Sequence, residues 1–544
     1  MKTLCMTLLI FVAAANGAHA ASLRGALPRQ NQTVPRASET PRFQAGLLAL
    51  KENRLPDALE DFSRAERENP SDARVHDFLG IVDLQLGRYD DAAREYEEAI
   101  RLDPGFEDAY RNLGFLEWNR HSFEAAQSHL EKAIARNPGD AFAHYYLGRV
   151  LLDAGQPARA FDELNRSGMA WPGDPAFLLQ AASGYLQLNR PKEARATLDR
   201  AAQLPLTPQQ TARATSLYMT LRDADAAAGL LQKFLAKANS NYAPWAEFDL
   251  ALAHLQGGEF QAAEKAALQF AAALPPDASP ADAAGAHSIV GIAQARDKNA
   301  EASIQSLRAA VRLAPSSEEC WLNLTLDLLQ TSHHSDAITA AQQGLAALPK
   351  SYALHLRLGA AYLAAERYPE SEKTFRELVD AGDPLPTSYL GLAQVLLRTG
   401  RAADAASELA AAEQKIGPNF LLFYFQGLAL DRAGRSTDAR LAYQRAVKLN
   451  PSNEEAHLGL ARDELATGDA SAAVGELQET LVLHPEDVQA RRLLSQAYMK
   501  LSDKENAAKY ATATEGTAPP QDENILGDFI LPDWLAPPPA AETK

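Results

Sequence analysis

The chain has 544 residues, 46% of them apolar and 23% charged, which is the composition of folded protein. It is too long for one ordinary core, so several domains or an elongated array are expected. The formal charge of −17 argues against nucleic acid as a partner, because no basic run with interleaved aromatic residues offsets it. Only two cysteines are present, so packing rather than disulfides must stabilise the fold.

Residues 1–20 predict a signal peptide. They read MKTLCMTLLIFVAAANGAHA, with one cation, an apolar stretch from Leu4 to Ala15 and a small-x-small cleavage pattern ending at Ala20. The apolar stretch is shorter than the roughly 20 residues needed to span a bilayer. We therefore expect an exported protein, periplasmic or secreted, with at most peripheral envelope association. A buried first helix is the alternative interpretation. Residues 21–38 are expected to form a flexible basic linker.

A pattern with a period of 34 begins near residue 39 and runs to about residue 520. It is clearest in residues 80–104, GIVDLQLGRYDDAAREYEEAIRLDP, and in residues 427–451, GLALDRAGRSTDARLAYQRAVKLNP. One small residue lies in the middle of a predicted helix, and a second follows twelve positions later, so that two helices can cross closely. The first small residue recurs at Gly46, Gly80, Gly114, Gly148, Ala182, Ala251, Gly291, Thr325, Gly359, Ala393, Gly427, Ala461 and Ser495.

Three further features complete each repeat. A large residue, such as Phe62 or Tyr96, is predicted to fill the space beside the helix crossing, and a proline, such as Pro70 or Pro104, ends the second helix. The turn between the helices often carries glycine or asparagine, which tolerate the left-handed conformation that ends a helix. These turn residues are Asn53, Gly87, Gly155, Asn189, Gly258, Gly400, Gly434 and Gly468.

This pattern, W/L-x-x-L-G-x-x-Y…A-x-x-x-F…A…P, resembles the tetratricopeptide repeat. The resemblance implies an all-α fold, an α-solenoid that forms a right-handed superhelix of about 14 helix-turn-helix repeats. We expect an N-terminal array over residues 39–240, with a degenerate sixth repeat at about 208–240, and a C-terminal array over 241–520. The phase slips at 203–210 and 274–285, which are either hinges or tolerated loop insertions.

The resemblance also implies a binding surface. In this family the first helix of each repeat lines the concave wall, through positions three before, one after and five after the small residue. Those positions hold the richest mixture of aromatic and polar residues in the third and fourth repeats. The candidate binding residues are Arg111, Asn112, Phe115, Asn119, Tyr145, Arg149 and Trp245.

A purely structural interpretation of these residues stays open. Phe115 and Tyr145 are also suited to packing between helices, and Arg111 to pairing with Asp108. Trp118 occupies a position that is leucine in most repeats, which favours a core role.

From the ninth repeat on, the same positions become apolar, which predicts a trough for an amphipathic helix or an apolar peptide. Its residues are Leu322, Leu326, Leu356, Leu390, Tyr424, Leu428 and Leu458. The acidic, apolar and proline-rich tail at 521–544 is one candidate occupant, through Ile525, Phe529, Ile530, Leu531 and Trp534; the tail is otherwise expected to be held by another protein.

No catalytic, metal or cofactor motif is recognisable, so the sequence predicts no enzyme and no cofactor. His333 and His334 precede Asp336, but real metal sites need three or four convergent ligands. The first hypothesis is an exported scaffold that binds protein or peptide partners in its concave groove, in envelope assembly or export. The alternative is a polysaccharide or peptidoglycan binder with stacking platforms at Trp118, Tyr145, Trp171 and Trp245. An unrecognised hydrolase is the third.

Overall fold

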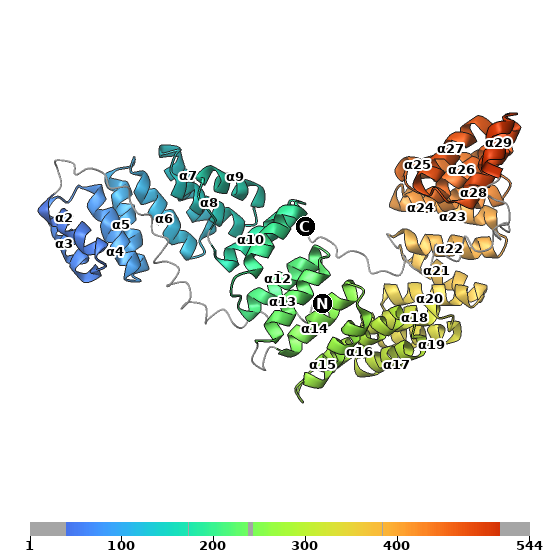
Figure 1. Cartoon of the computed structure of the whole chain (residues 1–544), viewed down its shortest axis with the longest axis horizontal. Coiled ribbons are helices and arrows are strands. Elements are labelled where there is room, and N and C mark those ends of the chain that lie inside the picture. The colour runs from blue at the N-terminus through green and yellow to red at the C-terminus, as the bar shows by residue number, and fades with distance from the viewer. Residues whose placement is uncertain (1–39, 172, 238–242, 383–384, 512–544) are drawn as a thin grey trace. The chain divides into compact units, whose positions relative to one another are not determined.

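The computed structural model describes residues 40–171, 173–237, 243–382 and 385–511. Within these ranges it contains 28 helices and no strand, and consecutive helices pair into hairpins (Figure 1). The predicted α-solenoid of about 14 helix-turn-helix repeats is therefore confirmed. The predicted signal peptide, the basic linker and the tail at 521–544 lie outside the described residues. In the described ranges no helix is long and apolar enough to cross a membrane.

The chain divides into two compact units, residues 1–230 and 231–544. The division falls inside α13, Ala224–Leu235. The first unit holds α2 (Pro41–Lys51), α3 (Leu55–Glu68), α4 (Ala73–Gln85), α5 (Tyr89–Leu102), α6 (Glu107–Asn119), α7 (Phe123–Arg136), α8 (Ala141–Asp153), α9 (Pro157–Ser167), α10 (Pro175–Gln187), α11 (Pro191–Ala202) and α12 (Pro208–Thr220).

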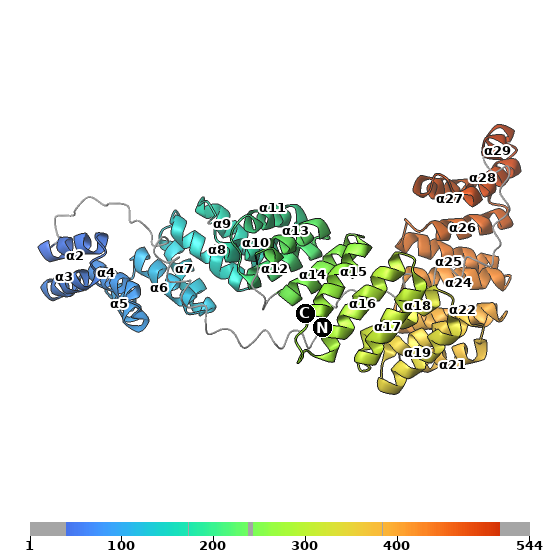
Figure 2. The same cartoon turned by 60° about the horizontal axis from the view of Figure 1, so that its bottom comes forward.

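The second unit continues with hairpins of the same kind, which follow one another in chain order (Figure 2). It holds α14 (Ala243–Gln256), α15 (Phe260–Ala273), α16 (Pro280–Arg296), α17 (Ala300–Leu313), α18 (Glu318–Gln330), α19 (His334–Ala347), α20 (Tyr352–Ala364), α21 (Tyr368–Asp380), α22 (Pro386–Arg398), α23 (Ala402–Ile416), α24 (Phe420–Arg432), α25 (Ser436–Leu449), α26 (Glu454–Thr467), α27 (Ala470–Leu483), α28 (Val488–Lys500) and α29 (Lys504–Ala511).

The spacing of small and large residues explains how each hairpin closes. The large side chain of the second helix lies directly against the small residue of the first. A Cβ added at Gly80 would lie 2.6 Å from the ring of Tyr96, and one added at Gly427 would lie 2.7 Å from Tyr443. Both tyrosines are almost fully buried. Any larger residue at these two glycines would force the helices apart.

Every turn between the two helices of a repeat uses the left-handed conformation, at the position seven residues after the small residue. The predicted glycines and asparagines have positive φ, for example 77° at Gly87 and 58° at Asn53. Other residue types adopt the same conformation elsewhere, for which the sequence carries no signal. These residues are His121, Arg222, Lys298, Ser332, Glu366 and Ser502.

The degenerate sixth repeat is regular in the structure. Thr215 is 2% exposed and takes the place of the small residue, and Arg222 adopts the left-handed turn. Ala227 and Leu231, both almost fully buried, then take the second small and the large positions. The repeat was hard to recognise because threonine and arginine replace glycine at its two marker positions.

Both phase slips are marked by the same capping device. Thr207 begins α12 and Ser279 begins α16, each with a capping box in which side chain and backbone exchange hydrogen bonds across three residues. A proline follows each cap at the first helical position, where its fixed φ suits a helix start. The chain therefore restarts its helical register after each interruption.

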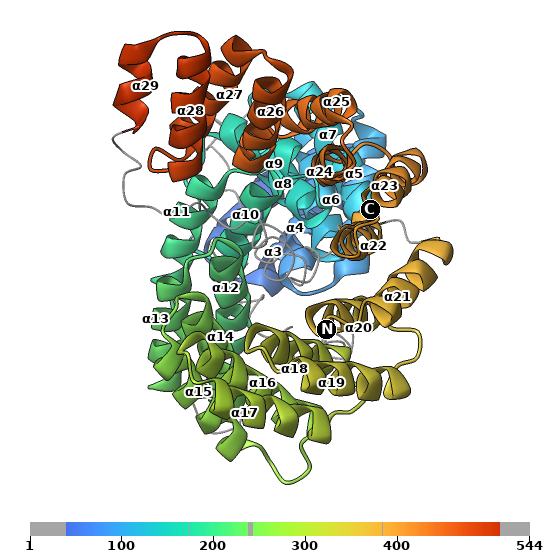
Figure 3. The same cartoon turned by 90° about the vertical axis from the view of Figure 1, so that its right-hand side faces the viewer.

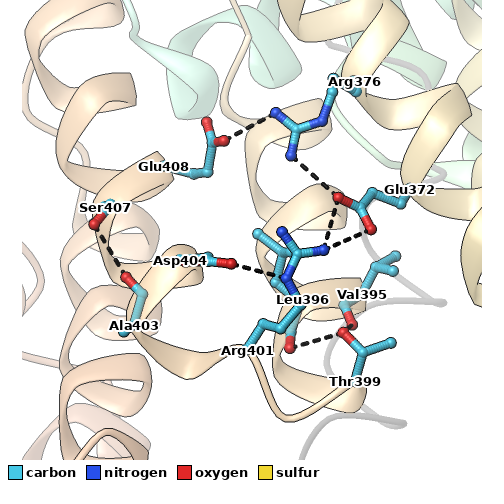
Figure 4. A network of polar contacts seen from close by, with 10 residues as sticks. All are labelled: Glu372, Arg376, Val395, Leu396, Thr399, Arg401, Ala403, Asp404, Ser407 and Glu408. Atoms are coloured by element: carbon cyan, nitrogen blue, oxygen red, sulfur yellow. Dashed lines mark hydrogen bonds and ion pairs between the residues drawn. The ribbon is translucent and has the colours of Figure 1, made fainter.

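Ion pairs between neighbouring second helices connect successive repeats. In Figure 4, Arg401 points to both Glu372 of α21 and Asp404 of α23, at 2.9 Å and 2.8 Å. Arg376 bonds Glu408 at 3.0 Å and Glu372 at 3.2 Å, which extends the network across the two helices. Because all five side chains are partly or largely exposed, each pair contributes only a few tenths of a kcal/mol to about 1 kcal/mol.

Candidate functional site

The candidate site lies on three first helices of the first unit, α6, α8 and α10, with α4 beside them (Figure 1). Helical spacing places the predicted positions on one face of each helix. Two of the helices begin after an aspartate N-cap, Asp140 for α8 and Asp174 for α10. The carboxylate of each aspartate accepts hydrogen bonds from backbone N–H groups in the first turn. The same aspartates contribute charge to the site.

Arg111 is buried between two repeats. Its guanidinium lies 2.5 Å from Asp108, one turn earlier, and donates to Asp140, at 2.8 Å, in the next repeat. Burial by itself would lower the pKa of Arg111, but the two carboxylates outweigh it and the pKa is raised. The pairing with Asp108 considered from the sequence is present. The side chain therefore joins α6 to the start of α8.

Asn112 connects α6 to the preceding repeat. Its amide donates to Oδ1 of Asp77, on α4, at 2.8 Å. Asp77 is completely buried, and burial raises its pKa to about 7. Hydrogen bonds therefore connect α6 to both neighbouring first helices, through Asn112 to α4 and through Arg111 to the start of α8.

Phe115 is 5% exposed and packs against two other rings. Its centroid lies 4.8 Å from that of Tyr146 and 6.0 Å from that of Trp118. Asn119 is half-buried, and its amide donates to the carbonyl oxygen of Phe115 at 3.0 Å. Phe115 is thus part of the packing between α6 and α8, which is the structural role that the sequence analysis left open for it.

Tyr145 and Arg149 are half-buried on α8 and lie next to each other. The Arg149 guanidinium donates to the Tyr145 hydroxyl at 2.9 Å and lies 3.7 Å from Asp174. It also lies over the rings of Trp118, at 4.9 Å, and Phe177, at 4.5 Å. Three elements thus fix the orientation of a guanidinium that solvent still reaches.

Trp118 belongs to this site, although its leucine-like register favoured a core role. It is half-buried, and its indole N–H donates to Asp153 of α8 at 2.5 Å. Gln180 of α10 donates to the other oxygen of Asp153 at 2.7 Å. The sequence does carry a signal for this contact, because Asp153 lies 35 positions after Trp118, which is about one repeat period.

Trp245 belongs to α14, in the second unit. Its side chain is 47% exposed, and its ring centroid lies 5.8 Å from that of Phe270. The first unit therefore brings together six of the seven predicted residues, Arg111, Asn112, Phe115, Asn119, Tyr145 and Arg149, and Trp245 is an exposed ring of the second unit.

The apolar positions of the second unit are buried or half-buried. Leu390 is fully buried, and Tyr424 and Leu458 are each 6% exposed. The remaining members are half-buried and pack against the hydrophobic cores, as do Leu326 and Leu428. Burial therefore closes three of these seven positions and leaves the other four partly accessible.

The histidine pair at the start of α19 makes only local contacts. His333 precedes the helix, and its ring nitrogen contacts the hydroxyl of Thr331 at 2.9 Å. In the part of the chain that the structure describes, no group of three or more His, Cys, Asp or Glu side chains converges as a metal site would require.

The fold and this face define the chain as an α-solenoid with an interaction surface on its first helices. A tetratricopeptide repeat model matches residues 43–106, 248–318, 322–386, 424–462 and 458–523, more than half of the chain, and a second matches 83–141. The chain belongs to the tetratricopeptide repeat family. Members of this family bind protein partners and are in general scaffolds rather than enzymes.

Individual relatives are distant. A model of anaphase-promoting complex subunit 3 matches residues 119–201. The chain is 24% identical over 198 residues to anaphase-promoting complex subunit 3 of Schizosaccharomyces pombe (strain 972 / ATCC 24843), which is 36% of this chain and 30% of that protein. The match therefore spans less than a third of that relative.

Similar solved structures cover more of the chain at low identity. Yeast Tom70 is 15% identical, with 88% of this chain and 98% of that chain covered and a TM-score of 0.41. The Cut9–Hcn1 hetero-tetramer of the APC/C is 13% identical over 84% and 95%, with a TM-score of 0.34. Pseudomonas aeruginosa pilF is 23% identical over 36% and 88%, with a TM-score of 0.31.

Proposed function

We propose that this protein is an exported scaffold that binds an extended segment of a protein partner along α6, α8 and α10, in envelope assembly or export. One observation carries the proposal: the guanidinium of Arg149 is fixed by Tyr145, Trp118 and Phe177 at a face that solvent reaches. Arginine and aromatic side chains held in this way are the residue types that dominate protein interfaces.

Preorganisation supports this role. The bonds from Asn112 to Asp77, from Arg111 to Asp140 and from Trp118 to Asp153 hold successive first helices in register. Little side-chain freedom remains to be lost when a partner binds, which lowers the entropic cost of association.

The polar groups of the site suit a peptide backbone. Guanidinium N–H groups donate to carbonyl oxygens, the Tyr145 hydroxyl can donate as well as accept, and the rings offer apolar area. The neighbouring carboxylates of Asp108, Asp140, Asp153 and Asp174 outnumber the two arginines, which disfavours a strongly acidic segment. The scaffold is expected to act without catalysis, as members of its family in general do.

The test is partner capture by cross-linking mass spectrometry with Arg149→Ala. The matched control is Arg159→Ala, which removes an exposed arginine from α9. The expected partner cross-links to α6, α8 or α10, and its yield falls tenfold or more with Arg149→Ala, because truncating an anchor residue costs about 2 kcal/mol or more. The proposal is rejected if the partner persists in that variant or if its cross-links map to other helices.

Trp118→Leu gives an independent test, since leucine occupies the equivalent position in Leu84 and Leu152 and should preserve the hairpin. The variant removes the ring beneath Arg149 and the bond to Asp153. Partner yield is expected to fall while the thermal unfolding temperature changes by only a few degrees. An unchanged yield would place the partner elsewhere.

Export is supported by the sequence of residues 1–20 alone. The mass of the protein isolated from cells should correspond to cleavage after Ala20, and Ala18→Asp should prevent that cleavage. A full-length protein that stays inside the cell would overturn this part of the proposal without affecting the binding face.

A polysaccharide or peptidoglycan ligand is the second candidate, favoured by the exposure of Trp245. Trp171 supports it less, because its ring is stacked against Phe161 and Tyr185 at 6.0 Å and 6.1 Å. Binding to purified peptidoglycan that is lost in Trp245→Ala but retained in Arg149→Ala would select this function over the first.

A further inference from the structure

The last hairpin that the structure describes consists of α28 and α29 (Figure 3), and it exposes apolar side chains. Met499 is 62% exposed and Leu501 is 45% exposed. We call these two residues, with the half-buried Tyr510 of α29, the end surface.

In earlier repeats, a following helix covers the position that Met499 occupies in the last repeat. Met499 lies four residues after the small residue of its repeat, and the same position is a buried leucine in five earlier repeats. Their exposed fractions are 9% for Leu84, 6% for Leu152, 3% for Leu329, 5% for Leu397 and 6% for Leu465.

In the preceding repeat, the following first helix provides the cover. Leu465 belongs to a buried cluster with Leu493, Leu494 and Ala497 of α28. Among the described residues, no helix follows α29. An array whose apolar terminal face remains open loses stability and solubility, which is why repeat arrays need a terminal cap.

The sequence after α29 supplies apolar residues suited to such a cover. Ile525, Phe529 and Trp534 lie within one short segment, residues 522–534, which reads DENILGDFILPDW. Ile525 and Phe529 are four positions apart, the spacing that places two side chains on one face of a helix. We call residues 522–534 the cap segment.

Charge distinguishes the cap segment from other apolar occupants. It contains four carboxylates, Asp522, Glu523, Asp528 and Asp533, and no cation. The last hairpin, residues 488–511, carries five cations and two carboxylates within a chain whose net charge is −17. Lys504 and Lys509 are exposed on α29, and the Nζ atom of Lys509 lies 5.3 Å from the ring centroid of Tyr510 in the end surface. Two copies that paired through their last hairpins would instead bring five cations against five cations, which charge disfavours.

The connection is long enough and keeps the segment close. Residues 512–524 join Ala511 to Ile525, and 13 residues can reach up to about 40 Å when extended. Tethering of this kind gives an effective concentration on the order of millimolar. A weak contact is therefore sufficient for occupancy in the same chain.

We propose that the cap segment, residues 522–534, binds the end surface of its own chain, with Phe529 against Met499 and its carboxylates facing Lys504 and Lys509. The site differs from the apolar trough predicted from the sequence, because Leu390, Tyr424 and Leu458 of that trough are already buried. It is also independent of the binding face on α6, α8 and α10.

A disulfide-trapping experiment tests the proposal on the full chain. Met499→Cys is combined with Phe529→Cys, in a background with Cys5→Ser and Cys320→Ala. The control pair keeps Phe529→Cys but moves the first cysteine to α25 as Leu441→Cys, a position that is 55% exposed. Mild oxidation is followed by non-reducing electrophoresis and mass spectrometry over a hundredfold range of protein concentration.

We expect an intramolecular disulfide in most molecules of the Met499→Cys pair, at every concentration, and at least fivefold less in the control pair. A disulfide between two chains that increases with concentration would overturn the proposal in favour of a second copy. Equal trapping in both pairs, or none in either, would also overturn it, since the segment would then have no preferred position.

A second measurement does not depend on cysteines. Phe529→Asp should speed amide hydrogen exchange in α28 and α29 several-fold, and should leave exchange in α24 unchanged. Leu535→Asp, just beyond the cap segment, is the matched control and should have a smaller effect. Unchanged exchange in Phe529→Asp would contradict the proposal.

Discussion

The two units use the same hairpin but join their first helices in different ways. In the first unit, hydrogen bonds from Asn112 to Asp77 and from Trp118 to Asp153 cross between repeats, and Tyr145 and Arg149 remain partly accessible. In the second unit the equivalent positions hold apolar residues, of which Leu390 and Tyr424 are buried, although the hydroxyl groups of Tyr352 on α20 and Thr387 on α22 still form a hydrogen bond between repeats at 3.0 Å. The first unit therefore presents partly accessible polar side chains at these positions, whereas the second unit presents apolar ones that are buried or half-buried.

This difference shows that the repeat register does not by itself define a binding surface. The same three positions per helix hold a bridging arginine at Arg111, an accessible one at Arg149 and a core leucine at Leu390. The neighbouring repeat decides which of these roles a position takes. The two kinds of junction should therefore respond differently to substitution.

Removing Arg111 should have the largest effect. Arg111→Ala leaves Asp140 buried without its partner in the adjacent repeat, and breaking a buried pair in this way costs roughly 3–5 kcal/mol. Hydrogen exchange should report lower local stability in α6 and α8 and little change in α24. Arg159→Ala, in an exposed pair, is the control and should cost less than about 1 kcal/mol. Equal effects of the two substitutions would contradict the bridging role.

Truncating Leu390 tests the apolar junction of the second unit. Leu390→Ala should cost roughly 2–5 kcal/mol, because it removes buried apolar area and leaves a cavity at a fully buried position. Leu428→Ala, at a half-buried position of the same face, should cost less. Urea unfolding followed by exchange in α22 and α24 provides the comparison. If Leu428→Ala proved as costly, the face would not be closed in the way described.

Buried acids predict that the second unit loses stability as the pH rises. Burial raises the pKa of Asp463 and of Glu464 to about 7 each. Around them lie Asp431 of α24, Arg440 of α25, Arg462 of α26, Asp469 at the N-cap of α27 and Glu476 within α27. Because the folded state retains these two protons up to a higher pH than the unfolded state, unfolding becomes easier between about pH 4 and 7.

His457 changes stability in the same direction. Its hydrogen bond with Glu476 raises the pKa of the imidazole, so its stabilising contribution is complete below the ordinary value near 6.5 and is lost as pH rises through the raised pKa. The thermal unfolding temperature should therefore fall by several degrees from pH 5 to pH 8. In Asp463→Asn combined with Glu464→Gln the slope should be smaller; an identical slope would contradict the assignment.

The smallest predicted effect concerns the turns. Lys298 has a φ of 62°, and Lys298→Gly should stabilise its hairpin by at most about 1 kcal/mol, because glycine avoids the left-handed penalty. Gly434 has a φ of 73° at the equivalent turn, and Gly434→Ala should destabilise by about 1 kcal/mol. Thermal unfolding of the two variants should shift in opposite directions. A shift of the same sign in both would show that side-chain contacts, not backbone strain, dominate these turns.

Most of the fold was predictable because hairpin packing is local in sequence. Gly80 and Tyr96 are sixteen residues apart, and their contact recurs in other repeats. The sixth repeat was predicted only as a degenerate one, because Thr215 and Arg222 occupy its two marker positions, although both adopt the expected structure. A pattern of residue types detects a register only where the preferred types are used.

The candidate site was predictable only as a set of positions. The sequence alone determined a period of 34, the close crossing within each hairpin and the face on which Arg111, Tyr145 and Arg149 lie. The tertiary structure decided that Arg111 is buried against Asp140, that Trp118 belongs to the site, and that Leu390 and Leu458 of the second unit are buried. These outcomes depend on contacts between residues about 30 positions apart, in different repeats, and only the stacking of one hairpin on the next brings them together.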